Sequence, residues 1–150
     1  MSLNDLMQII TGTVGTFGFA ILFNIRGKRL AACAVGGFLT CFLFALANLI
    51  ISSEVVNYFI VALIISLYAE IAARVFKTPT TSFITTSLIP LIPGSSLYYT
   101  MAYAFKSDGL VFSEKAVHTL QLASALALGI IVATTLTKIV SESIEKAKQK

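Results

Sequence analysis

The residues best suited to bind a small anion lie between positions 90 and 99, in the middle of a long apolar segment. Pro90 and Pro93 lack backbone N–H donors and clash with a preceding helical turn, so a continuous helix cannot pass through them. A new helix starting near Gly94 would present unpaired N–H groups, up to about Leu97, at the positive end of its dipole, which suits a carboxylate. The predicted substrate-binding residues of this stretch are Pro93, Gly94, Ser95, Ser96, Tyr98 and Tyr99, with the serines as hydroxyl donors and the tyrosines as a wall.

A second candidate group is the pair Glu70 and Arg74, which lie one helical turn apart in the third apolar segment. An acid at membrane depth costs roughly 2.5–3.5 kcal/mol on insertion scales, so it usually faces protein or water. Glu70 is therefore predicted to carry a coupling proton or to hold an ammonium group, and Arg74 to meet an anionic substrate.

Both groups also have a purely structural interpretation. The prolines can form a kink whose freed backbone groups are satisfied by neighbouring helices. Glu70 and Arg74 can pair with each other at the cytoplasmic rim, with the apolar stem of Arg74 in the hydrocarbon layer. The sequence leaves both interpretations open beside the functional ones.

The sequence gives little support for an enzyme or a metal centre. His118 is the single histidine and is expected to be solvated or packed near the external rim, while Cys33 and Cys41 match no zinc spacing. There is no phosphate-binding loop, and no basic patch with interleaved aromatic residues that would bind nucleic acid. We therefore expect no catalytic residues, no cofactor, no metal ligands and no nucleic-acid partner.

The composition requires a membrane. The chain has 150 residues, of which 57% are hydrophobic and 12% charged, whereas soluble domains carry about 25% charged residues. Five apolar segments each reach the roughly 20 residues that cross a bilayer. We expect an all-α integral membrane protein with five transmembrane helices, the fourth broken between Pro90 and Gly94. The expected transmembrane domain is 1–140, with spans at about 6–23, 30–51, 55–76, 80–105 and 117–140, followed by a basic cytoplasmic tail at 141–150.

The basic residues predict the orientation. Nine of the 11 Lys and Arg residues lie in the first connection, at the junction of the third and fourth spans, or at the end of the last span and after it. Only Lys106 and Lys115 lie on the other side. Because basic residues favour the cytoplasmic side, the N-terminus is predicted to lie outside and the C-terminus in the cytoplasm.

Small residues recur along three of the expected spans, and such residues allow membrane helices to approach closely. We expect close helix packing along them, with sliding of the fifth span as an alternative. The sets are Gly12, Gly15 and Gly18; Gly36, Gly37 and Thr40; and Gln121, Ala125, Gly129, Ala133 and Thr137.

Local signals predict several helix ends. Thr78 is expected to cap the fourth span, with Pro79 at its first helical position. A loop with a turn at Asp108 and Gly109 is expected between Lys106 and Lys115, and Ser113 is expected to cap the fifth span. Asn24 and Asn48 are expected to form hydrogen bonds at the ends of the first two spans, and the tail is expected to extend the fifth helix.

Four motifs, taken in this order, resemble the threonine/serine exporter (ThrE) superfamily. They are Phe23-Asn24-Ile25-Arg26-Gly27, Ala69-Glu70-Ile71-Ala72-Ala73-Arg74, Lys77-Thr78-Pro79, and Pro90-Leu91-Ile92-Pro93-Gly94 followed by Tyr98-Tyr99. The resemblance runs from the first span to the fifth. The chain length and the five spans are similar to the small, separately encoded C-terminal half of the family, the YjjB-type subunit. The absence of tryptophan departs from the expected aromatic anchors.

The resemblance implies a multi-pass protein of the bacterial inner membrane that exports threonine and serine. Some split members of the family are associated with dicarboxylate (succinate) export, which is the alternative substrate class. The implied partner is the larger YjjP-type subunit, and five spans alone make a small bundle for alternating access, so hetero-assembly or homo-oligomerisation is expected. A second functional class remains, a non-transporting membrane assembly or interaction subunit in which the broken span is only a kink.

Overall fold

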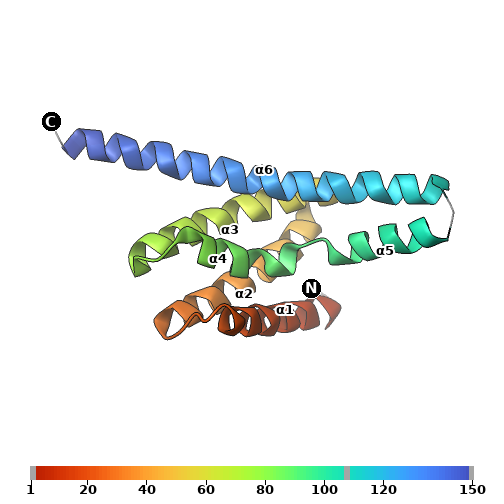
Figure 1. Cartoon of the computed structure of the whole chain (residues 1–150), viewed down its shortest axis with the longest axis horizontal. Coiled ribbons are helices and arrows are strands. Elements are labelled where there is room, and N and C mark those ends of the chain that lie inside the picture. The colour runs from red at the N-terminus through yellow and green to blue at the C-terminus, as the bar shows by residue number, and fades with distance from the viewer. Residues whose placement is uncertain (1–2, 107–108, 149–150) are drawn as a thin grey trace.

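The computed structural model describes residues 3–106 and 109–148, and the regular structure of these residues is helical. Figure 1 shows long helices running side by side along one direction, with an interruption between α4 and α5. The helices are α1 (Leu3–Leu22), α2 (Lys28–Ile50), α3 (Glu54–Phe76), α4 (Thr80–Leu88), the short 3₁₀ helix η1 (Ile89–Leu91), α5 (Gly94–Phe105) and α6 (Gly109–Lys148).

Four of the described helices, α1, α2, α3 and α6, are long and apolar enough to cross a membrane. The remaining predicted span is divided into α4, η1 and α5 by the two prolines. The all-helical membrane class and the break between Pro90 and Gly94 are therefore confirmed. Helix α6 has 40 residues, about 60 Å at 1.5 Å per residue, which is twice the thickness of a hydrocarbon core. Its C-terminal end projects beyond the other helices (Figure 1).

Two predicted helix starts are wrong. Helix α6 begins at Gly109, so Ser113 lies inside the helix and does not cap it; Asp108 lies outside the described residues. Nothing after Gly109 breaks a helix, so the apolar run from Leu110 joins the span. At α4, Pro79 has extended backbone and is itself the cap, while the Thr78 hydroxyl donates back to the Phe76 carbonyl.

The predicted hydrogen bonding at the helix ends involves both asparagines. Asn24 adopts a left-handed conformation after α1, with φ of 58°, and its N–H donates to the Ile21 carbonyl. Asn48 accepts a hydrogen bond of 2.7 Å from the Asn57 amide, which joins the end of α2 to the start of α3. Lys77 is also left-handed and ends α3, and such residues close a helix by pairing its last carbonyls.

Helix α3 lies at the centre of the bundle and contacts α2, α4 and α6. Val61, Ala62 and Ile65 of α3 pack with Leu122 of α6 and Leu88 of α4 in one buried cluster. A second cluster, nearer the end of α3, consists of Cys33, Ala69, Ala72, Ala73, Phe83 and Ala20. Among the four long apolar helices, the one with the highest share of buried residues is thus the one that positions Glu70 and Arg74.

Glycines allow the closest helix contacts. A Cβ at Gly12 would meet Cys41 and Pro90, one at Gly36 would meet Ser87, and one at Gly37 would meet Thr16. At Gly129 a Cβ would lie 2.7 Å from the Phe59 carbonyl oxygen and 2.8 Å from Ala62. These glycines confirm the predicted packing, whereas Gly15 and Gly18 have no neighbour within 4 Å and belong to an outward face.

Replacing Gly129 by alanine is expected to lower the free energy of unfolding by about 1–3 kcal/mol, because the added Cβ meets a backbone carbonyl that cannot move aside alone. The midpoint of thermal unfolding in detergent measures the loss. Gly18→Ala is the matched control and is expected to leave the midpoint unchanged or to raise it slightly, because alanine favours a helix. Equal midpoints for the two variants would contradict the packing described here.

Candidate functional site

The start of α5 presents a small set of backbone donors. Pro93 caps the helix, the Gly94 N–H donates to the Ile92 carbonyl at 2.7 Å, and the Leu97 N–H donates to the Pro93 carbonyl at 3.0 Å. The expectation that all four N–H groups from Gly94 to Leu97 are free is therefore wrong, because the turn at Ile92 and Pro93 uses the first and the last. In the described part of the chain, the N–H groups of Ser95 and Ser96 have no acceptor.

These donors lie on an open surface. Gly94 and Ser95 are exposed, Ser96 and Pro93 are partly buried, and a Cβ at Gly94 would have no neighbour within 4 Å. Tyr98 and Tyr99 are 67% and 55% exposed, with ring centroids 5.5 Å apart. The structure thus brings the predicted residues of the stretch together at one helix start, but leaves them uncovered by this chain.

Helix α5 has one main neighbour, α6. The hydroxyls of Thr100 and Thr119 lie 2.9 Å apart and join the two helices. None of the residues of α5 is buried. A helix this open in a membrane has most of its apolar surface available to lipid or to another protein.

The α4 side of the break is satisfied within the chain. Pro90 packs against Gly12 of α1. The Thr40 hydroxyl of α2 lies 2.7 Å from the Ser87 carbonyl oxygen, to which it donates. Neighbouring helices therefore support this half of the break, as the kink interpretation predicts. The buried hydroxyls of Ser66 and Ser87 have no hydrogen-bond partner among the described residues.

Glu70 and Arg74 line a second place in the structure, a mostly apolar groove of about 260 Å³ between α3 and α6. The Arg74 guanidinium donates from Nη2 to the Thr137 carbonyl oxygen at 3.1 Å. Within the described residues it forms no ion pair with Glu70, so the structural alternative in which the two side chains pair is not observed. Small residues such as Ala133 and Gly129 allow the α6 backbone to approach α3 closely. The Arg74 guanidinium therefore donates to a backbone carbonyl of α6 and not to the Glu70 carboxylate.

The two groups of predicted site residues do not meet. Thr100, one turn after Ser96, contacts α6 at Thr119, whereas Arg74 contacts it at Thr137. These two points lie about 27 Å apart along α6 at 1.5 Å per residue. One chain therefore carries two separate polar places, one at the start of α5 and one at the end of α3.

One contact between distant segments was not predicted. His118 Nε2 lies 3.1 Å from Glu54 Oε2, which joins α6 to the first residue of α3. The sequence placed His118 near the external rim but contained no signal that it meets Glu54 across 64 positions. Exposed fractions of 40% and 49% limit the contribution of this pair to stability to about 1 kcal/mol at most.

The comparisons with known proteins identify the family. The sequence matches the family described as Threonine/Serine exporter, ThrE, over residues 8–136. The chain belongs to this family. No curated protein and no solved structure matches it. Membership in ThrE, together with the long apolar helices, makes the chain a multi-pass membrane component of a threonine/serine exporter-type transporter.

Arg74→Gln is expected to lower the free energy of unfolding by about 1 kcal/mol, because it removes a charged donor that joins the end of α3 to α6. Glu70→Gln is the matched control in the same groove and is expected to change it by less than about 0.5 kcal/mol, because Glu70 forms no ion pair there. Thermal unfolding of both variants in detergent provides the comparison. A larger loss for Glu70→Gln than for Arg74→Gln would contradict this assignment.

Proposed function

We propose that this chain is a subunit of a secondary transporter that exports small carboxylate metabolites across the bacterial inner membrane, with threonine and serine favoured over dicarboxylates. The family supplies the reaction class. The observation that carries the site is the pair of unpaired N–H groups of Ser95 and Ser96, exposed at the start of a broken span. Helix starts bind carboxylates because their free donors and their dipole both favour negative charge.

In the proposed topology the chain crosses the membrane five times, with the N-terminus outside and the C-terminus in the cytoplasm. Arg26 lies in the connection after α1, and Lys28 and Arg29 begin α2. Arg74 lies in the last turn of α3, and Lys77 follows that helix. The positive-inside rule assigns this end to the cytoplasm. The break then falls near the bilayer midplane, where broken helices of secondary transporters hold their substrates.

The proposed transporter requires a second subunit, either the larger YjjP-type subunit or a further copy of this chain. Helix α5 packs mainly on α6 and buries none of its residues, and Tyr98 and Tyr99 remain open. Backbone donors that face lipid would be costly. A partner helix over α5 would enclose the carboxylate and supply the remaining substrate contacts.

The separation of the two polar places removes both Arg74 and Glu70 from the start of α5, so the preference for an amino acid over a dicarboxylate rests on the family. A dicarboxylate needs a second cationic group, and Arg74 is occupied by the Thr137 carbonyl far from the start of α5. In this proposal Glu70 carries a coupling proton and does not hold the substrate ammonium within the same chain. A non-transporting assembly subunit, in which the break is only a kink, remains the alternative supported by the α4 side.

Ser95→Pro tests the carboxylate site, because proline is tolerated in the first helical turn but lacks the N–H that would bind the substrate. Gly94 precedes it and has no Cβ to clash with the ring. With both subunits in inverted vesicles, the KM for radiolabelled threonine should rise about tenfold or more. Ser95→Ala, which keeps the N–H, should stay within about threefold of the unaltered chain.

An unchanged KM in folded Ser95→Pro would contradict the site, and transport of neither threonine nor succinate by the unaltered pair would contradict the transporter assignment. Uptake of succinate alone would select the dicarboxylate alternative. The same vesicles, with and without a proton gradient, test Glu70→Gln. Gradient dependence should disappear in that variant, and unchanged dependence would remove Glu70 as the proton carrier.

The proposed orientation predicts how introduced cysteines react. Lys106→Cys should react with a membrane-impermeant maleimide in intact cells, whereas Lys77→Cys should react only after the membrane is permeabilised. Both positions are exposed, and the native Cys33 and Cys41 are buried, so background labelling should be low. The opposite labelling pattern would invert the topology, and labelling of both positions from outside would contradict five crossings.

A further inference from the structure

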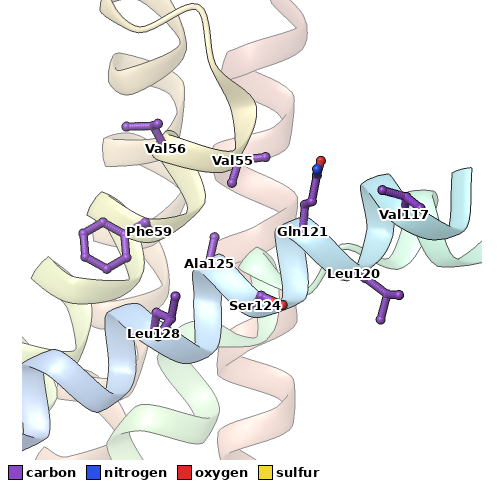
Figure 2. A pocket seen from close by; sticks show the side chains of 9 residues that line it. All are labelled: Val55, Val56, Phe59, Val117, Leu120, Gln121, Ser124, Ala125 and Leu128. Carbon is purple, nitrogen blue, oxygen red and sulfur yellow. The ribbon is translucent and has the colours of Figure 1, made fainter. Parts of the chain in front are cut away.

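A long groove lies between α3 and α6, near the start of α3 and away from both polar places described above. Its inner part has a volume of about 520 Å³ and is almost entirely apolar. Val55 and Phe59 of α3 face Ala125 and Leu128 of α6 across it (Figure 2), and Leu120 lines its side. A close approach of the two helices at Gly129, beside Phe59 and Ala62, lies next to the groove.

The groove continues over the surface of α6 into a polar chamber of about 530 Å³, whose described lining residues all belong to α6. The chamber shares Val117 and Gln121 with the apolar part. Glu114 and Lys115 border this chamber with opposite charges, beside the His118 imidazole. His118 is itself held by the Glu54 carboxylate at 3.1 Å. The two chambers together form one amphipathic groove, apolar toward the membrane interior and polar toward the end where α3 begins.

Gln121 lies where the two chambers meet. Its side chain is exposed and points into this junction (Figure 2). An amide at the edge of a hydrocarbon layer requires a hydrogen-bond partner, because a polar group without one costs free energy. From Glu114 to Gln121 the helix rises about 10 Å, close to the roughly 5–8 Å depth of one interfacial layer.

We propose that this groove binds one phospholipid of the external leaflet, with a zwitterionic headgroup that carries a primary amine. An acyl chain lies along Phe59, Leu120 and Leu128, and the Gln121 amide donates to an ester carbonyl. The phosphate faces Lys115, and the ammonium group faces Glu114. The leaflet follows from the orientation proposed above, whereas the occupancy of the groove does not depend on transport.

Charge and polarity decide between occupants. The apolar chamber is open along its side, so in a bilayer its natural content is a hydrocarbon chain. An anionic headgroup would leave the Glu114 carboxylate facing like charge, whereas a headgroup with both signs satisfies Glu114 and Lys115 together. A partner helix in the groove would leave these charges at the mouth without a complementary group.

The test uses the full-length chain in phosphatidylcholine vesicles that contain a phosphatidylethanolamine with a photoactivatable acyl chain. After illumination, labelled peptides are mapped by mass spectrometry. Labelling should concentrate at Leu120 and Leu128, relative to the exposed Ile139 on the same helix outside the groove. Unlabelled phosphatidylethanolamine should compete, and phosphatidylglycerol should compete about tenfold less well.

A matched pair of variants separates the groove from the rest of the helix surface. Ser124→Phe fills the apolar chamber and should reduce labelling about tenfold, whereas Ala127→Phe, an exposed position that does not line it, should stay within about twofold. Equal labelling at Ile139, equal competition by phosphatidylglycerol, or no effect of Ser124→Phe would overturn the proposal. Loss of labelling when the larger subunit is present would also overturn it, because a protein would then occupy the groove.

Discussion

The arrangement of this protein depends on one constraint, the backbone between Leu88 and Gly94 that leaves α-helical geometry inside an apolar bundle. At membrane depth such backbone persists only where protein, water or a bound molecule satisfies its polar groups. On the α4 side, α1 and α2 meet this requirement through Gly12, which admits Pro90, and Thr40, which donates to the Ser87 carbonyl. The scaffold therefore supports half of the break.

The α5 side of the break is exposed, whereas the α4 side is covered by neighbouring helices. In the proposed function, the exposed side is the one that takes part in transport. The N–H groups of Ser95 and Ser96 lack acceptors within the described chain, and α5 packs mainly against α6. A substrate carboxylate would satisfy the donors during transport, and a second subunit would cover the helix. In this view the incomplete side of the break is where both the substrate and the partner belong, consistent with a component of a threonine/serine exporter.

Helix α3 is joined to α6 near both of its ends. It is tied to α6 at its first residue by the Glu54–His118 pair and near its last by the Arg74–Thr137 hydrogen bond. Between these ties, Gly129 and the buried alanines keep the two backbones close. Toward the start of α3, side chains of both helices line the amphipathic groove at Gln121.

The sequence by itself determined the apolar spans, the break at the prolines and the family, because span length, missing N–H donors and motif order are local properties that packing cannot change. Tertiary structure alone decided which polar groups meet. Glu70 and Arg74 share a helix face, yet the close approach of α6 gave Arg74 a backbone acceptor instead. In the turn at Ile92, the Gly94 N–H donates to the Ile92 carbonyl and is no longer free. The contact of Glu54 with His118 depends on how α3 and α6 pack against each other. The spacing of residues along one helix does not predict the distances between polar groups on different helices, because these distances depend on how the neighbouring helix packs.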